Sequence, residues 1–67
     1  MIGKEIKKYR QEAGLTQKEL AIKAEVTQQC ISKYEKGGVN YDYHICMKIF
    51  DALDIEFYFR KKGERGN

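Results

Sequence analysis

The stretch that decides the fold is residues 16–37, TQKELAIKAEVTQQCISKYEKG. It opens on Thr16 in a Thr-x-x-Glu capping box, a pattern that predicts the first turn of a helix. We expect this helix to end near Glu25, because a second threonine, Thr27, follows after a short turn and suits the N-cap of another helix. Two short helices joined by a tight turn are therefore predicted, the second over residues 28–36.

The residues on either side of this stretch also have helical periodicity. Apolar side chains between Ile2 and Ala13 recur every three or four residues, which predicts an amphipathic helix with Gly14 at its C-terminal end. After a pair of glycines, Asn40 or Asp42 can cap a fourth helix. The apolar stripe of that helix is predicted to consist of Ile45, Cys46, Ile49, Phe50 and Leu53.

The periodicity changes after Asp54. Apolar residues alternate with charged or polar ones over residues 55–61, which predicts a β-strand. A single strand leaves its backbone N–H and C=O groups without partners in the chain, so we expect it to pair with the same strand of a second copy across a two-fold axis. The alternative is that residues 55–61 extend the fourth helix or lie flat on the bundle. The side chains assigned to the dimerisation strand are Ile55, Phe57, Tyr58 and Phe59.

The sequence therefore predicts a mainly α protein with four helices and a C-terminal strand paired across a dimer. Residues 1–54 would form the helical domain, residues 55–61 the dimerisation strand and residues 62–67 a flexible tail. With 67 residues the chain has room for one domain, whose core is marginal for independent stability. Dimerisation is the expected source of further stability, because the two cysteines have no spacing that suggests a disulfide framework.

Composition limits the classes of protein to which the chain can belong. Thirteen Lys and Arg residues against ten Asp and Glu give a net charge of +3. The basic residues crowd the first helix and the tail, which suits a positive face presented to a polyanion and is also common on ordinary solvated helices. No apolar run approaches the roughly 18 residues of a membrane helix, and no signal peptide follows Met1, so we expect a cytoplasmic protein with reduced thiols and no membrane partner.

The helix predicted over residues 28–36 has two distinct sides. At about 100° per residue, its polar side chains fall within roughly 140° of one another and its apolar ones lie opposite. Glutamine can bond adenine through N6 and N7, and lysine can bond guanine through O6 and N7. Each polar side chain taken singly fits an ordinary solvated surface, but together with the turn and both caps the set predicts direct contact with double-stranded DNA. The predicted base-reading residues are Gln28, Gln29, Ser32 and Lys33, and the opposite side carries Cys30, Ile31 and Tyr34.

Two strings, TQKELA at residues 16–21 and VTQQCISKYEKG at residues 26–37, resemble the Cro/C1-type (XRE) helix-turn-helix family. The similarity runs from Ile2 to about Leu53 and implies a lambda-repressor-like helical bundle that acts as a transcriptional repressor. In such a bundle, polar side chains at the start of a helix and in the loop after the recognition helix touch the DNA backbone. The phosphate contacts that we assign on this basis are Gln17, Thr27, Lys36 and Asn40.

The resemblance also implies a structural ion pair between Arg10 and Glu35, which would tie the first helix to the end of the third. Arg10 has a competing role as a phosphate contact. Both roles are chemically possible, because a guanidinium has enough N–H donors to hold a carboxylate and reach a phosphate. The sequence leaves the two roles open.

The residues near the end of the chain resemble one subgroup of this family. The string LDIEFYF at residues 53–59 is similar to HipB-like antitoxin repressors, in which a C-terminal strand forms a ribbon with its dimer mate. This similarity implies a homodimer that binds a palindromic operator, represses its own operon and binds a toxin such as a HipA-like kinase. Half-sites in such dimers commonly lie about 34–36 Å apart. The alternatives are a phage-type Cro/C1 regulator and an antitoxin that acts only through protein–protein contact.

Enzymatic and metal-binding classes find little support in the sequence. The single histidine, His44, has no nucleophile at motif spacing, and neither a Gly-rich phosphate loop nor a carboxylate pair on an apolar face occurs, so we expect no catalysis and no cofactor. His44, Cys46 and Cys30 match no usual zinc spacing and lack a fourth ligand, so we expect no metal site. Both cysteines are predicted to be buried as small apolar side chains.

Overall fold

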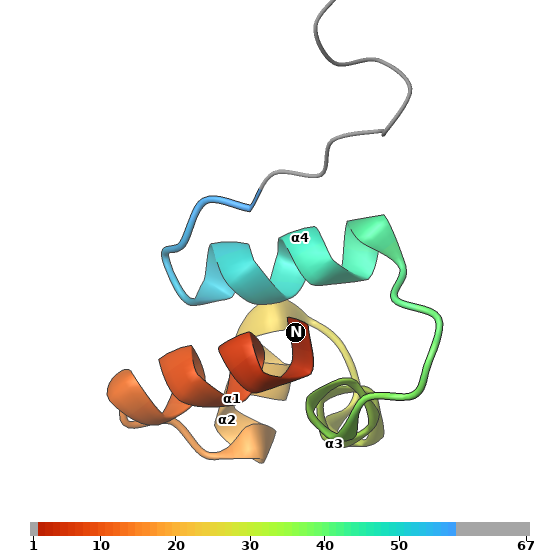
Figure 1. Ribbon diagram of the computed structural model, residues 1–67. Coiled ribbons are helices and arrows are strands. Elements are labelled where there is room, and N and C mark those ends of the chain that lie inside the picture. Colours follow the sequence, from red (N-terminus) through yellow and green to blue (C-terminus); the bar gives the residue numbers. More distant parts are fainter. Residues whose placement is uncertain (1, 58–67) are drawn as a thin grey trace, which may run out of the picture.

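The computed structural model describes residues 2–57, which form four α-helices (Figure 1). The helices are α1 (Ile2–Glu12), α2 (Gln17–Ala24), α3 (Gln28–Lys36) and α4 (Tyr43–Ala52). No strand occurs among the described residues, so the prediction of a mainly α fold is confirmed for this part of the chain. Contacts between elements join α2 to both α3 and α4, and α1 to α3. Figure 1 shows α4 lying across one side of the bundle, with α1 and α3 on the other.

The two threonine caps predicted for α2 and α3 are both present. The Thr16 Oγ1 accepts a hydrogen bond from the Glu19 backbone N–H at 3.0 Å, and the Glu19 carboxylate accepts one from the Thr16 N–H at 2.9 Å. The Thr27 Oγ1 accepts a hydrogen bond from the Cys30 N–H at 3.1 Å. Each cap satisfies a backbone donor that the helix itself cannot satisfy, and such a cap typically contributes about 1 kcal/mol.

The turn between α2 and α3 depends on one residue with left-handed backbone geometry. Glu25 has φ 61° and ψ 43°, and its N–H donates to the carbonyls of Ala21 and Ile22. The Val26 N–H also donates to the Ala21 carbonyl, at 3.0 Å. The chain therefore leaves α2 and enters the Thr27 cap within two residues. A side chain in this conformation costs roughly 1–2 kcal/mol, so the tight turn carries local strain.

The loop between α3 and α4 is held by two tyrosines. The Tyr34 hydroxyl accepts a hydrogen bond from the Asp42 N–H at 2.9 Å, and the Tyr41 hydroxyl donates to the Tyr34 carbonyl at 3.0 Å. The two rings meet edge to face with centroids 5.0 Å apart. Of the two predicted caps for α4, Asp42 is the one that forms, because its carboxylate accepts from the Ile45 N–H at 3.0 Å. Asn40 lies exposed in the loop.

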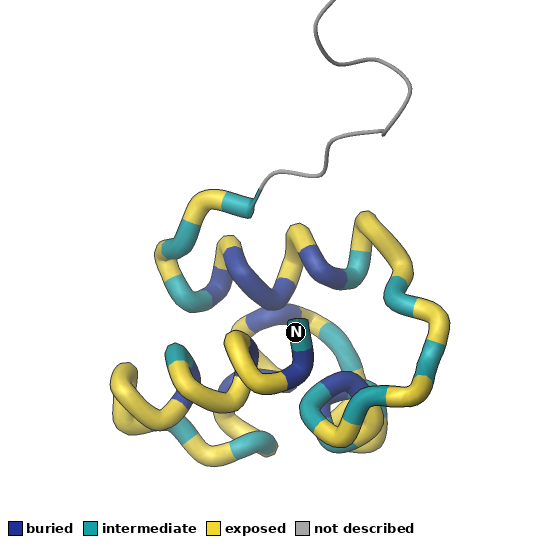
Figure 2. The backbone as a smooth tube through the Cα atoms, in the orientation of Figure 1, coloured by how far each residue is buried: buried dark blue, intermediate teal, exposed yellow. Residues whose placement is uncertain are grey.

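The core lies where the four helices meet, as the buried positions in Figure 2 show. The inner side of α2 consists of Leu20, Ala21 and Ala24, which are all buried. Each large apolar side chain that is fully removed from water contributes roughly 1.5–3 kcal/mol. The largest fully buried side chains come from all four helices and are Ile6, Leu20, Ile31, Ile49 and Cys46.

The buried side of α1 differs from the predicted apolar stripe. Ala13 lies beyond the last residue of the helix and is exposed, whereas Gly3 and Arg10 are buried. A Cβ atom added to Gly3 would overlap the carbonyl oxygen of Tyr34 and lie 2.7 Å from that of Glu35. Only glycine therefore allows the start of α1 to pack so closely against the end of α3. Apolar periodicity could not identify this contact, because glycine contributes nothing to an apolar stripe.

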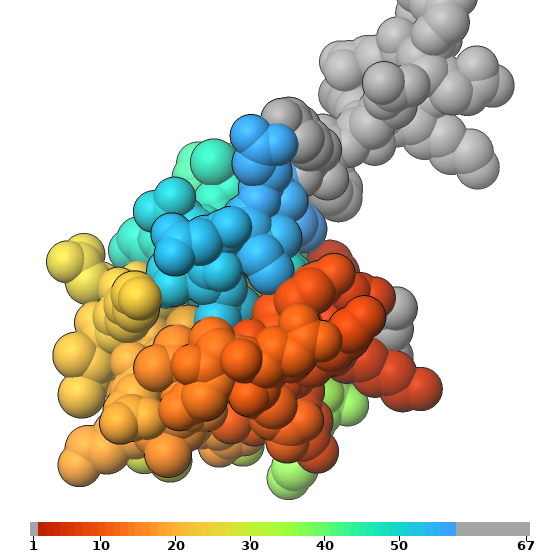
Figure 3. All heavy atoms as spheres, turned by 90° about the vertical axis from the view of Figure 1, so that its left-hand side faces the viewer, coloured from red at the N-terminus to blue at the C-terminus, as the bar shows by residue number. Residues whose placement is uncertain are grey.

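The residues after α4 turn back onto that helix. Asp54 adopts φ 59°, and the Ile55 N–H donates to the Phe50 carbonyl at 2.9 Å. The Phe57 ring stacks on the Phe50 ring with centroids 4.9 Å apart and planes 3° from parallel. Ile55 and Phe57 are half-buried while Glu56 is exposed, so the predicted alternation is visible. Figure 3 shows this segment, in blue, on the face of the molecule above α1.

Residues 55–57 thus lie against the bundle and do not extend α4, which ends at Ala52. Of the two alternatives to a strand, the described residues match the one in which the segment lies flat. The rest of the predicted dimerisation strand, with Tyr58 and Phe59, lies outside the described residues, as does the predicted flexible tail. Pairing of this segment with a second copy of the chain stays a prediction.

Candidate nucleic-acid interface

The helix α3 turns its polar side outward, as its periodicity predicts. Its inner side chains, Ile31 and Tyr34, are buried at 0% and 7% exposure. Burial raises the pKa of the Tyr34 hydroxyl, so this group stays neutral while it accepts its hydrogen bond from the backbone. The other side of the helix carries its polar residues, namely Gln28, Gln29 and Lys33, which are exposed, and Ser32, which is half-buried.

The cysteine of α3 lies between these two sides. Cys30 is half-buried, whereas Cys46 on α4 is fully buried, so the prediction that both are buried is correct only for Cys46. Burial raises the pKa of both thiols, and the nearby Lys33 ammonium partly offsets this effect at Cys30. Both cysteines are therefore neutral thiols at pH 7.

The Thr27 hydroxyl, which caps α3, donates no hydrogen bond within the part of the chain that the structure describes. Thr27 is exposed, and its hydroxyl oxygen accepts from the Cys30 N–H. A hydroxyl that accepts one hydrogen bond retains its own proton for donation. Thr27 can therefore cap the helix and donate to an anionic oxygen at the same time, so its structural and functional roles are compatible.

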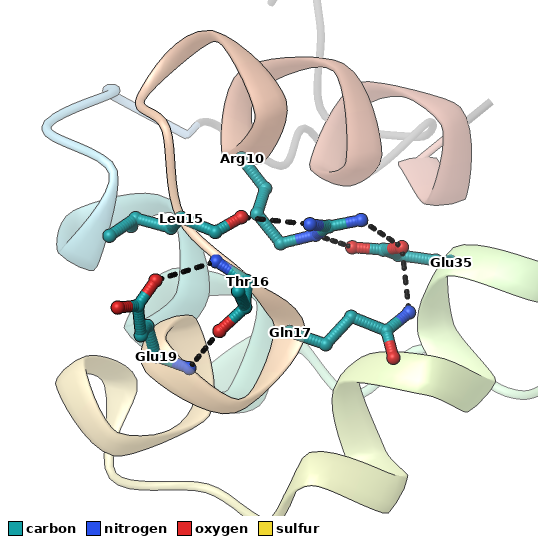
Figure 4. Close-up of polar contacts among 6 residues, drawn as sticks. All are labelled: Arg10, Leu15, Thr16, Gln17, Glu19 and Glu35. Carbon is teal, nitrogen blue, oxygen red and sulfur yellow. Dashed lines mark hydrogen bonds and ion pairs between the residues drawn. The ribbon is translucent and has the colours of Figure 1, made fainter.

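The side chain of Gln17, at the start of α2, lies beside α3. Its Nε2 donates to the Glu35 Oε1 at 3.0 Å, as Figure 4 shows. A primary amide has two N–H donors, so one remains for a further acceptor. Gln17 also lines a surface concavity together with the polar residues of α3, namely Gln28, Gln29 and Ser32. The contact between Gln17 and Glu35 was not predicted from the sequence, which gives no direct signal for a pairing between helices.

Arg10 and Glu35 form a two-point ion pair between α1 and α3 (Figure 4). The Arg10 Nε lies 2.6 Å from one carboxylate oxygen and its Nη2 lies 3.1 Å from the other. The Arg10 Nη1 donates to the Leu15 carbonyl at 2.8 Å. The side chains are only 11% and 5% exposed, respectively. Because all three guanidinium nitrogens are engaged inside the protein, the structural role of Arg10 is favoured over a phosphate contact.

The remaining predicted phosphate contacts lie at the surface near the end of α3. Lys36 is exposed in the last turn of that helix, and Asn40 is exposed in the loop that follows. Lys36 can also stabilise α3 by interacting with the negative end of its dipole, as can Lys33. His44 is exposed at the start of α4. Within residues 2–57, no group of three His, Cys, Asp or Glu side chains is arranged to hold a metal ion.

Comparison with known proteins places this geometry in a family. A helix-turn-helix family model matches residues 6–59 of the chain. The chain is 33% identical over 64 residues to the HTH-type transcriptional regulator YqaE of Bacillus subtilis, which covers 96% of this chain and 55% of that protein. It is 36% identical over 63 residues to multiprotein-bridging factor 1 of Candida albicans, which covers 94% of this chain and 42% of that protein. The chain thus spans about half the length of these curated relatives. None of the helices described is long and apolar enough to cross a membrane.

Proposed function

The chain belongs to the helix-turn-helix family, and from that premise we propose that it is a sequence-specific double-stranded DNA-binding protein that represses transcription. The observation that carries the proposal is the outward polar side of α3. Gln28, Gln29 and Lys33 are exposed on this side, while Ile31 and Tyr34 fix the helix to the core. An α-helix fits the major groove of DNA, where glutamine and lysine side chains can distinguish base pairs.

The charges around α3 also support contact with DNA. The one carboxylate on this helix, that of Glu35, is paired with Arg10, accepts a hydrogen bond from Gln17 and is 5% exposed, so its negative charge is offset within the protein. Lys33 and Lys36 are exposed on the same helix. In this proposal the outward side of α3 reads bases, while contacts to the backbone come from residues around it. These backbone contacts are Gln17, Thr27, Lys36 and Asn40.

Titration with DNA tests this function. A binding site is first selected from a random duplex library, and its affinity is then compared with that of a scrambled duplex by fluorescence anisotropy at several salt concentrations. We expect the selected site to bind at least about 10³-fold more tightly and the affinity to fall steeply with salt, because bound phosphates release counterions. Affinity that ignores both sequence and salt would contradict the proposal and favour a protein that acts only through protein–protein contact.

We further propose that the chain binds a palindromic operator as a homodimer and that residues 55–61 contribute to the dimer interface. The half-buried positions of Ile55 and Phe57, on either side of the exposed Glu56, support a segment with one apolar side. Sedimentation equilibrium of the protein, alone and on its selected duplex, measures the number of copies. Two copies per palindromic site are expected, and a single copy on an isolated half-site would contradict the dimer.

The finer assignment that we propose is a HipB-like antitoxin that represses its own operon and binds a HipA-like kinase. Its support is the similarity of residues 53–59 to that class. Two other assignments are tested beside it: a phage-type Cro/C1 regulator, and a protein-contact role, which the name multiprotein-bridging factor of one relative favours. Specific binding to the DNA upstream of the chain's own gene, with a kinase-like neighbouring reading frame, supports the antitoxin. Binding elsewhere, with no such neighbour, contradicts it.

A further inference from the structure

A second surface concavity lies beside the reading side of α3. It is lined by one residue from α1, one from α2 and three from α3, so three helices meet at this place. The lining residues are Lys7, Gln17, Ser32, Glu35 and Lys36. Three of these residues, Gln17, Ser32 and Lys36, are DNA contacts predicted from the sequence, whereas Lys7 is not one of them.

The charge of this concavity is positive. The Glu35 carboxylate is paired with the Arg10 guanidinium, so these two charges offset one another. Lys7 and Lys36 are both exposed and remain as two positive charges at the rim. A site with two ammonium groups and the second N–H of the Gln17 amide suits an anion with several acceptor oxygens. A phosphodiester has this chemistry.

The concavity lies beside the side chains that are proposed to read bases. Gln17 and Ser32 line both this concavity and the neighbouring one, which also contains Gln28 and Gln29. A phosphate held here would therefore lie next to the side chains proposed to read base edges. This is the arrangement expected where the backbone borders the major groove, because phosphate contacts fix the register in which base contacts are made.

We propose that Lys7 of α1 is a DNA-phosphate contact, which together with Lys36 holds one phosphate of the backbone against Gln17. This inference rests on the proposed function. It gives α1 a direct part in binding DNA in addition to its structural pairing through Arg10. Lys7 and Arg10 are three residues apart on α1 and so share a side of that helix, which is the signal by which the sequence could have pointed to Lys7.

The test compares Lys7→Gln with Lys8→Gln. Lys8 is the next residue of the same helix and is also exposed, but it does not line the concavity, and its Nζ lies 5.3 Å from the Tyr9 ring centroid. Both variants lose one positive charge, so a difference between them reports local contact. Affinity for the selected duplex and for a scrambled duplex is measured by anisotropy over a range of salt concentrations, and folding is checked by circular dichroism.

We expect Lys7→Gln to weaken binding to both duplexes about tenfold and to reduce the slope of log affinity against log salt by about 0.9, the value for one phosphate. Lys8→Gln is expected to leave the slope unchanged, and Lys7→Arg, which keeps the charge, to retain that of the unmodified chain. Equal slopes for the two glutamine variants would overturn the role of Lys7 while leaving the proposed function intact. An unmodified chain that binds no duplex would overturn both.

Discussion

The two sides of α3 differ in what they contact, and the difference separates stability from recognition. The inner side places Ile31 and Tyr34 in the core and Glu35 in an ion pair with Arg10. The outer side exposes Gln28 and its polar neighbours, and these make no contribution to the buried core. Substitutions on the inner side should therefore change mainly the free energy of unfolding, and substitutions on the outer side should change mainly the affinity for DNA.

The largest effect is expected from Ile31→Ala. This side chain is completely buried, so its truncation should lower the free energy of unfolding by about 4 kcal/mol through lost burial and the resulting cavity. A domain of this size has a small free energy of unfolding, so chemical denaturation should show that the Ile31→Ala variant is largely unfolded. Lys33→Ala, on the exposed side of the same helix, should change stability by less than about 0.5 kcal/mol. Similar losses in both variants would remove the distinction between the two sides.

Arg10→Ala should be the next most damaging change. It leaves the Glu35 carboxylate buried without its cation, which typically costs 3–5 kcal/mol, and we expect about 3 kcal/mol here because the pair retains slight exposure. Thermal unfolding followed by circular dichroism measures the loss, and DNA affinity should fall with it. The double variant Arg10→Met/Glu35→Leu should recover most of the stability. An unchanged melting temperature for Arg10→Ala would contradict a structural ion pair.

The Gln28→Ala variant tests whether the outer side of α3 affects DNA affinity without affecting stability. The side chain is exposed, so the melting temperature should stay the same. Affinity for the selected duplex should fall by about 2 kcal/mol, and base preference should relax at one position of each half-site. Competition anisotropy against duplexes substituted at single positions measures both effects. A loss of equal size on every sequence would mean that Gln28 touches only the backbone.

The smallest effect, and the only stabilising one, is expected from Glu25→Gly in the turn between α2 and α3. Glycine adopts the left-handed geometry of this position without steric cost, so the variant should gain about 1 kcal/mol. Lys23→Gly, placed inside α2, should instead lose about 1 kcal/mol. Urea denaturation of the two variants gives the comparison. A loss of stability in both would show that Glu25 contributes through contacts of its own.

Features set by neighbouring residues could be predicted from the sequence. The caps Thr16 and Thr27 form as expected, and α3 has the predicted bounds, because capping requires only a side chain and a backbone N–H a few residues away. The outward direction of Gln28 follows from helical periodicity once the apolar side is known. The left-handed conformation of Glu25 could not be predicted in this way, because glutamate has no special preference for it.

Features set by packing between helices could not be predicted from periodicity alone. The close approach of Gly3 to the end of α3 and the bond from Gln17 to Glu35 depend on how α1 and α2 are placed relative to α3. The pairing of Arg10 with Glu35, 25 residues apart, was expected only through resemblance to a family. Local chemistry thus indicated which side of α3 faces outward, and tertiary packing determined what surrounds it.

The central claim is that the outer side of α3 contacts the DNA duplex. The most direct measurement is a titration of the isotopically labelled chain with its selected duplex, followed by amide chemical shifts in NMR spectra. The largest changes are expected at Gln28, Gln29 and Lys33 on α3, with little change at Met47 and Ile55, which line a separate concavity formed by α4 and the segment after it. Changes concentrated at Met47 and Ile55, with α3 unaffected, would contradict the account.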